Sequence, residues 1–463
     1  MKANKWFGDA AFYRMVLHVA VPLIVQQMIT SFVNMLDNIM VGQVGTLAMS
    51  GVSIANQLTT IFNLAVFGSV AACSIFGAQF FGKKDMQGMQ YCLRFKLVIE
   101  LVITIAVTCL FLTFSKPLIQ LFLSSSANSA EDIALTMQYA HSYLLIMTIG
   151  FLPFALTQCL TTTFSETGRT KLPMISSIIA VSTNFVFNWI LIFGHFGLKA
   201  LGSDGAAIAT VISRFVELGV VSYFVITFKQ DFPFFHNLFK GFHIPKNLMK
   251  QIIIKGLPLM MNEVLWSTGI ACITQCYSVR GIDAVAAYNI TTTIQNLFFV
   301  FNIGMGNSIS IIVGQKLGAG KLEEAVDTDR KMIVFTFIVS IMIGAALCIA
   351  APLFPALYNT SEYIRETSTN MVHIAGLALW IGSIYNACYF TLRCGGKTII
   401  TFLFDSVGTI FVSFPVAYIL AHYTNLSIVH MFFILQFVDL YKVILGLFLL
   451  HKRIWVNDLV ANK

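Results

Sequence analysis

The sequence predicts an all-α membrane protein with twelve transmembrane helices in two pseudo-twofold-related six-helix bundles. Three observations support this class: 57% of the 463 residues are hydrophobic, only 11% are charged, and the mean hydropathy is +0.79. Soluble proteins carry about 25% charged residues. The composition therefore excludes a disordered chain, and it fits a secreted disulfide scaffold equally badly.

Apolar segments long enough to cross a bilayer follow one another along the whole chain. A helix needs about 20 mostly apolar residues to span the hydrocarbon. These segments lack the polar face of soluble helices, and they do not alternate as barrel strands do. The twelve expected spans lie near 15–38, 51–76, 93–115, 134–160, 172–194, 206–228, 251–277, 287–313, 332–355, 370–392, 398–421 and 428–450.

The positive charges are distributed unevenly between the two sides. If both termini are cytoplasmic, all but six of the 29 Lys and Arg residues lie on the cytoplasmic side. Because cytoplasmic loops are enriched in Lys and Arg, we expect a multi-pass protein of the cell membrane with both termini in the cytoplasm. The net charge of +8 thus reflects topology and gives no support to a nucleic-acid partner. The six exceptions are Lys116, Lys199, Arg280 and Arg365 outside, and Arg214 and Lys442 within spans.

An internal repeat sets the expected domain organisation. Pro22, Gly45 and Gly68 each recur 236 residues later, at Pro258, Gly281 and Gly304. Six spans separate equivalent elements, so both halves have the same orientation and are related by an axis along the membrane normal. We expect a first lobe at 1–228, a cytoplasmic linker at 229–250 and a second lobe at 251–463. Transporters built this way bind substrate between their halves.

Several short motifs give the chain a family resemblance. They are Asp37-Asn38-Ile39-Met40-Val41-Gly42, Gly77-Ala78-Gln79 with Gly82, Gly168-Arg169-Thr170 with Pro173, the run 205–210 (Gly-Ala-Ala-Ile-Ala-Thr), and Gly395-Gly396-Lys397-Thr398. In this order and spacing, the chain resembles the multidrug and toxic compound extrusion (MATE) family over nearly its whole length. The resemblance implies two lobes that export amphipathic organic cations in exchange for Na⁺ or H⁺.

Asp37 is the first candidate for binding the coupling ion. A carboxylate inside a membrane helix costs about 2.5–3.5 kcal/mol and marks a functional site by default, and no Lys or Arg lies within one helical turn of Asp37. The resemblance places the first-lobe cation site here. It implies that Asp37 would be a ligand of Na⁺ if sodium is the coupling ion. It completes the site with two polar residues of the fifth span, here Asn184 and Asn188, which share one helix face. Thr210 in the sixth span is a further candidate for the same cluster. The alternative for the asparagines is interhelical hydrogen bonding alone.

Glu263 and Asp405 are the corresponding candidates in the second lobe. Both are acids within expected spans, and the resemblance implies that an acid in the seventh span binds the coupling ion or the substrate. The alternative for Asp405 is a bond to a neighbouring helix or a kink. Two i, i+3 pairs, Arg214–Glu217 and Asp439–Lys442, are expected to neutralise themselves as structural contacts.

Pro22 and Pro258 lie at equivalent positions inside the first and seventh spans. Proline removes a helical hydrogen bond and permits bending, so these residues are candidate hinges, with plain packing as the alternative. Gly314 and Gly318 form a small-xxx-small pair, which predicts a close helix approach.

The predicted function is therefore a secondary active antiporter that exports drugs and other amphipathic organic cations by alternating access. Its expected partners are small organic cations and membrane lipid, it needs no cofactor besides the coupling ion, and we expect a monomer. The alternative is a flippase for lipid-linked precursors from the same wider superfamily. An enzyme is not expected, because the sequence has neither a P-loop nor histidines at metal-ligand spacing.

Overall fold

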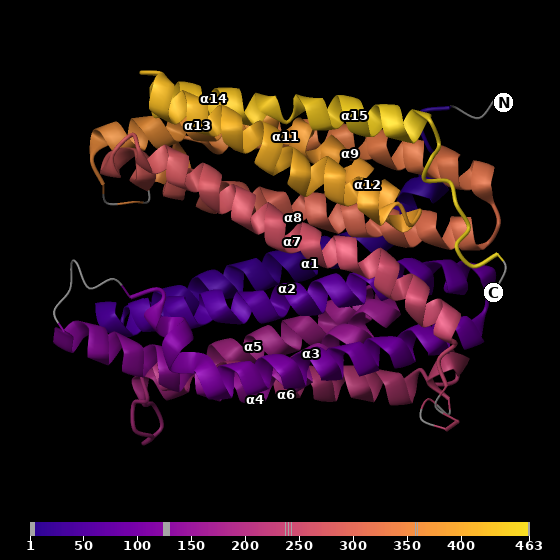
Figure 1. Ribbon diagram of the computed structural model, residues 1–463, viewed down its shortest axis with the longest axis horizontal. Helices are drawn as coiled ribbons and strands as arrows, with labels where there is room; N and C mark the ends of the chain where they lie inside the picture. Colours follow the sequence, from indigo (N-terminus) through magenta and orange to yellow (C-terminus); the bar gives the residue numbers. More distant parts are fainter. Residues whose placement is uncertain are drawn as a thin grey trace. The chain divides into compact units, whose positions relative to one another are not determined.

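The computed structural model describes residues 5–123, 130–236, 238, 240–241, 243–356, 358 and 360–461, so positions 237, 239 and 242 of the expected linker lie outside the described residues. Regular structure in this part of the chain is helical throughout (Figure 1). The elements are α1 (Ala10–Gly42), α2 (Thr46–Lys83), α3 (Met86–Gln120), α4 (Ala130–Glu166), α5 (Lys171–Phe193), α6 (Ser203–Thr227), η1 (Pro233–Phe235), α7 (Lys246–Ser278), α8 (Ile282–Gly318), α9 (Leu322–Ala350), α10 (Leu353–Ala356), α11 (Glu362–Cys394), α12 (Thr398–Phe402), η2 (Leu403–Val407), η3 (Thr409–Ser413), α13 (Phe414–Tyr423), α14 (Ile428–Val438) and α15 (Leu440–His451).

Eleven helical stretches in the described residues are long and apolar enough to cross a membrane. Two of them each combine several short elements, Thr398–Tyr423 and Ile428–His451. The twelfth expected span corresponds to α7, which has 33 residues and is not among these eleven; Lys255, Asn262 and Glu263 interrupt its apolar sequence. The predicted all-helical membrane class is confirmed.

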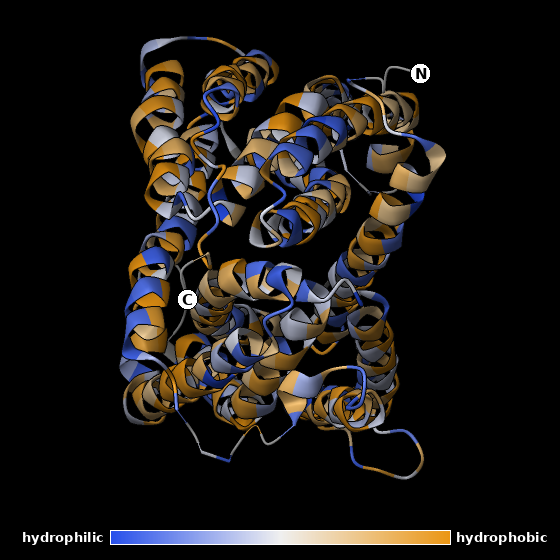
Figure 2. Cartoon of the chain, turned by 90° about the vertical axis from the view of Figure 1, so that its right-hand side faces the viewer, coloured by the Kyte–Doolittle hydropathy of each residue, from blue (hydrophilic) through white to orange (hydrophobic). Residues whose placement is uncertain are grey.

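Apolar side chains fill the interior and also cover much of the outside. Large apolar residues such as Ile226, Ile349 and Phe411 are more than 70% exposed, whereas Lys96 and Glu100 are completely buried. Figure 2 shows that hydrophobic residues make up most of the helical ribbon. Long apolar helices with many large exposed apolar side chains suit hydrocarbon surroundings.

The packing of helices divides the chain into two compact units. Unit 1 comprises Met1–Ile24, Ala78–Lys84 and Ile253–Lys463, and unit 2 comprises Val25–Gly77 and Asp85–Ile252. Helices α1, α2 and α7 are continuous through the points where the chain passes from one unit to the other. The lobe boundary expected at 229–250 stays a prediction.

Unit 2 is organised around α4 and α6. Helix α4 packs against α3 and α6, and α5 packs against α6. The centre is aromatic: the Phe62 and Phe151 rings stack with centroids 4.1 Å apart, and Phe154 lies beside them. These rings form one wall of the cavity described below.

Unit 1 is organised around α11, which packs against α8, α9, α14 and α15. The end of α2 crosses α8 through a reciprocal contact at repeat-equivalent positions. Gly82 lies directly against the backbone of Gln315, and Gly318 lies against the backbone of Gln79. A side chain at either glycine would collide with main-chain atoms, so the close helix approach predicted from Gly314 and Gly318 is confirmed.

A segment after the last helix, residues 452–461, folds back onto unit 1, and we call it the C-terminal strap. Its Trp455 is 1% exposed and its Val460 is fully buried. The Gln79 amide donates to the Cys394 and Asn457 carbonyls (3.0 and 3.3 Å), and its oxygen accepts from the Leu459 N–H at 2.7 Å. The strap thereby fixes the end of α2.

The span Thr398–Tyr423 is not a regular α-helix. It contains two consecutive π-helical segments, η2 and η3, separated by Gly408. Such wide turns are rare and often occur at functional sites. Asp405 lies in the first of them.

Candidate functional site

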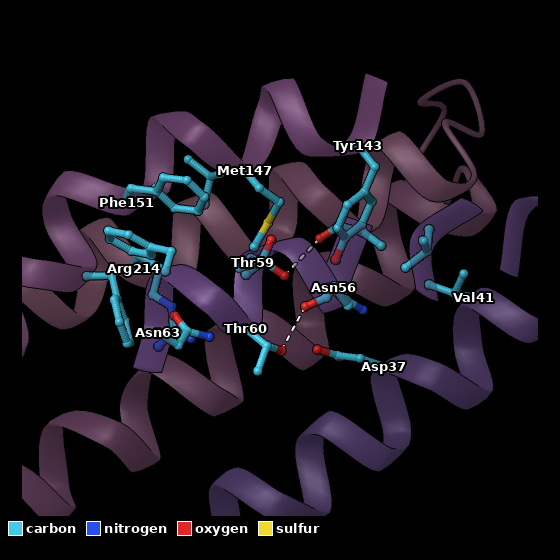
Figure 3. A pocket seen from close by; sticks show the side chains of 17 residues that line it. Asp37, Val41, Asn56, Thr59, Thr60, Asn63, Tyr143, Met147, Phe151 and Arg214 are labelled. Carbon is cyan, nitrogen blue, oxygen red and sulfur yellow. Dashed lines mark hydrogen bonds between the residues drawn. The ribbon is translucent and has the colours of Figure 1, made fainter. Parts of the chain in front are cut away.

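A cavity of about 280 Å³ lies inside unit 2 between α1, α2, α4 and α6. Figure 3 shows the Asp37 carboxylate pointing into the same space as Asn56 and Thr60 of α2. Aromatic residues and one methionine form the rest of the wall, namely Phe62, Tyr143, Met147, Phe151 and Phe154. The cavity therefore combines one carboxylate, several amide and hydroxyl groups, and apolar rings.

A chain of hydrogen bonds leads from this carboxylate across three helices. The Asn188 amide donates to Asp37 Oδ1 at 2.6 Å and to Asn184 Oδ1 at 3.0 Å. The Asn184 amide donates in turn to Thr210 Oγ1 at 3.2 Å. The structure thus brings together all four residues that the sequence assigns to the first-lobe site.

The asparagines are held by the geometry of α5. One helical turn separates Asn184 from Asn188, so both point from the same face, and both are buried. The Asn188 side-chain oxygen is buried with no hydrogen-bond partner among the described residues. A free carbonyl oxygen next to a carboxylate is the donor set that hard cations use, so the arrangement can bind a cation or a proton.

Arg214 of α6 also lines this cavity, which the sequence alone does not indicate. Its expected ion pair with Glu217 is present at 3.3 Å, and its guanidinium lies 4.7 Å from the centroid of the Phe154 ring. Glu217 accepts a further hydrogen bond from Ser177. The local i, i+3 spacing identified the pair, but only the packing of α6 shows that Arg214 faces the space occupied by Asp37.

Asp405 in unit 1 is bonded to residues other than its expected partner. It lies 3.6 Å from the Lys442 ammonium and accepts a 3.1 Å hydrogen bond from Asn262. Within the described residues, neither a hydrogen bond nor an ion pair connects Asp405 to Glu263. The predicted Asp439–Lys442 contact is present at 3.6 Å, so Lys442 contacts two acids.

Glu263 is half-buried on α7, next to Asn262 in the sequence. The charges that act on it are those of Arg393 on α11 and Asp405 in η2. Asn262 was not among the predicted site residues. The repeat could have identified it, because Asn262 is the equivalent of Gln26, whose amide donates to Ser177 at 2.9 Å in unit 2.

The two candidate hinge residues lie inside continuous helices, Pro22 in α1 and Pro258 in α7. Pro22 is two residues before the point where α1 passes from unit 1 to unit 2, and Pro258 is five residues after the corresponding point in α7. Their role as hinges stays a prediction.

Three comparisons with known proteins agree. The MatE family model matches residues 22–190 and 258–419. The probable multidrug resistance protein NorM of Thermotoga maritima is 24% identical over 413 residues, which cover 89% of this chain and 86% of the relative. The probable multidrug resistance protein YoeA of Bacillus subtilis is 24% identical over 417 residues, covering 88% and 87%.

Solved structures show the same fold at lower identity. The outward-facing conformation of a multidrug resistance MATE family transporter of the MOP superfamily has a TM-score of 0.86 and 17% identity, with 98% of each chain covered. A MATE structure in complex with MaD3S has a TM-score of 0.85 at 17% identity and the same coverage. Since the family model covers more than half of the sequence and the described helices have the corresponding fold, this multi-pass membrane protein belongs to the MatE (multidrug and toxic compound extrusion) family of transporters.

Proposed function

We propose that this transporter exports amphipathic organic cations in exchange for Na⁺ or H⁺, and that Asp37 binds the coupling ion. The observation that carries the proposal is the hydrogen-bond chain from Asp37 through Asn188 and Asn184 to Thr210. It holds a carboxylate at the edge of a cavity lined by aromatic rings. Aromatic faces attract organic cations, so ion and substrate can compete for one region.

Exchange follows if the two ligands favour different conformations. A ligand shifts a conformational equilibrium only by its differential affinity for the two states. Neutralising Asp37 with a proton or Na⁺ would weaken its attraction for an organic cation, which would then leave. Because coupling is reciprocal, a bound organic cation lowers the affinity for the coupling ion by the same factor.

Glu263 and Asp405 would provide a second cation-binding region in the other half. Bending at Pro22 and Pro258 would let the two lobes, 1–228 and 251–463, change between conformations open to either side of the membrane. The positive-inside distribution of Lys and Arg supports cytoplasmic termini in the cell membrane. The names of the relatives, probable multidrug resistance proteins, support drug-like substrates.

The decisive experiment is transport in proteoliposomes with a fluorescent organic-cation dye under separate Na⁺ and H⁺ gradients. We expect the downhill flow of Na⁺ or of H⁺ to drive dye transport in the opposite direction by the wild-type protein. Asp37→Asn should reduce the rate of this transport at least tenfold. Asp204→Asn is the matched control, because Asp204 is also an acid on a spanning helix but bonds Ser142 outside the cavity. Wild-type rates in the Asp37 variant would overturn the assignment.

One observation favours the flippase alternative. Arg214 gives the cavity a positive group that could attract a phosphate. Glu217 compensates this charge, so we regard the organic-cation function as the better supported. Translocation of a fluorescent anionic lipid by the same vesicles, without dye transport, would reverse this order.

A further inference from the structure

Lys442 of α15 is buried between two carboxylates in unit 1. Its ammonium lies 3.6 Å from Asp405 Oδ1 and 3.6 Å from Asp439 Oδ1, and its side chain is 3% exposed. It also donates to Thr409 Oγ1 at 3.0 Å and lies 5.1 Å from the centroid of the Tyr385 ring. We call Asp405, Asp439 and Lys442 the charge triad.

The π-helical segments provide both the position of Asp405 and part of its surroundings. Asp405 belongs to η2, while Thr409 and Ser413 belong to η3. Ser413 donates to Asp439 Oδ1 at 3.1 Å, so η3 contacts two members of the triad. The span departs from α-helical geometry over ten residues around the buried Lys442 and two partly buried acids, which indicates more than packing.

The repeat provides an internal comparison for the triad. At the two repeat offsets, Gln26 corresponds to Asn262, Ser177 to Asp405 and Arg214 to Lys442. The polar contacts recur as well: Gln26 donates to Ser177, and Asn262 donates to Asp405.

The charge balance of the two halves nevertheless differs. In unit 2 one acid, Glu217, pairs with Arg214, and the pair is neutral. In unit 1 two acids share Lys442, so the triad carries one excess negative charge. A structural ion pair needs only one of the two acids.

An excess charge in a low-dielectric interior is costly and tends to be neutralised by a bound proton or cation. Among the described residues, two further charges of opposite sign act near this region, Glu263 on α7 and Arg393 on α11. The neighbouring side chains Tyr385, Tyr389 and Tyr441 are phenols, which carry no charge at neutral pH. The excess therefore belongs to the triad.

The position of Lys442 determines which ligand fits. Its ammonium already lies within 4 Å of both carboxylates, and a metal cation added there would be repelled at close range. A proton neutralises one carboxylate without needing a separate coordination shell.

We infer that the charge triad is a proton-binding site of the second half, in which Asp405 and Asp439 hold one exchangeable proton. The inference deepens the proposed function. Proton binding by the triad does not depend on that function, but the use of the proton in transport rests on it. Binding forms an O–H bond between one carboxylate oxygen and a proton taken from water on one side. Release returns that proton to water on the other side.

The test uses infrared difference spectroscopy of purified protein between about pH 6 and pH 9, where exposed carboxyl groups, with a pKa of about 4, are already ionised. It counts the carboxyl groups that lose a proton within this range. If the excess charge holds the proton, Asp439→Asn should lose one titrating carboxyl group relative to wild type. Lys442→Met should gain one, and the double variant Lys442→Met with Asp439→Asn should match wild type. Glu323→Gln, in an exposed ion pair with Arg453, is the control and should leave the count unchanged.

A purely structural triad predicts a different pattern. If Asp439→Asn and the double variant both give the wild-type count, the inference is overturned. Asp439→Asn removes an excess charge and so should fold, and size-exclusion profiles check this. The double variant has the wild-type net charge and is the charge-matched control; the count of Asp439→Asn decides between the two cases, and the expected gain of one group in Lys442→Met is the second test.

The spectra need no transport, so they separate this inference from the proposed function. Protein that shows the expected counts but does not exchange tetraphenylphosphonium for Na⁺ or H⁺ would refute the proposed function and leave the proton site standing. If transport is H⁺-driven, Asp439→Asn should lower it at least tenfold, and the double variant should recover most of the rate. Unchanged counts with active transport would refute the triad alone.

Discussion

The Asn188 amide donates a 2.6 Å hydrogen bond to the Asp37 carboxylate, joining α5 to α1 beside the cavity of unit 2. The bond uses one lone pair of Asp37 Oδ1, leaves the others for a proton or cation, and places the Asn188 side chain next to the carboxylate. The strength of cation binding should therefore depend on what residue stands at position 188.

Asn188→Asp should increase the affinity for Na⁺ about tenfold, equivalent to about 1.4 kcal/mol. Two carboxylates this close cannot both ionise unless a cation lies between them. The measurement is the Na⁺-dependent rise in thermal stability of purified protein. Asn63→Asp, which adds an acid elsewhere in the cavity, is the matched control, and equal Na⁺ responses in both variants would contradict the prediction.

Gly318→Ala should lower the free energy of unfolding by about 1–3 kcal/mol, the usual cost of overpacking. Its new methyl group would collide with the Gln79 backbone at the crossing of α2 and α8. Gly219 of α6 has open space around the same position. Gly219→Ala should leave the stability unchanged or increase it. Equal denaturation temperatures of the two variants in detergent would show that the crossing of α2 and α8 does not limit stability.

Glu166→Gln should destabilise the protein by about 3–5 kcal/mol, because it leaves the Lys96 ammonium buried without its counter-charge. Lys96 pairs with Glu166 inside unit 2 and is fully buried. Asp231→Asn breaks the half-exposed Arg169–Asp231 pair instead and should cost less than about 1 kcal/mol. Chemical unfolding curves of both variants compare the two pairs directly, and similar midpoints would show that the buried pair is dispensable.

Trp455→Ala should cost about 3–5 kcal/mol, as for other large buried side chains, because Trp455 anchors the C-terminal strap. Trp6→Ala, at a tryptophan that is 54% exposed, is the comparison and should cost much less. Limited proteolysis should cleave the strap faster only in the Trp455 variant. Equal cleavage rates would mean that other contacts hold the strap.

The sequence predicted the features that depend on local spacing. Asn184 and Asn188 share a helix face because they are one turn apart, and Arg214 pairs with Glu217 for the same reason. Hydrophobicity alone identified the helical membrane class, since few other folds tolerate so little charge.

Contacts between distant segments could not be predicted in the same way. Lys442 contacts Asp405, which lies in the first of two π-helical segments of its span, and the sequence gives no sign of these segments. A fixed period of 3.6 residues misplaces every residue after such a turn. The strap was missed because its contacts with Gln79 involve backbone groups, which hydropathy does not describe.

The Gln79 contacts also constrain the order of assembly. Gln79 precedes its partners Cys394 and Leu459 by 315 and 380 residues, so it leaves the ribosome long before either exists. Until residues 457–459 are made, the Gln79 side chain lacks its hydrogen bonds to the Asn457 carbonyl and the Leu459 N–H. Contacts between segments so far apart in the sequence form late, so the strap completes the fold. In a nascent chain stalled before residue 452, the end of α2 should therefore still be exposed.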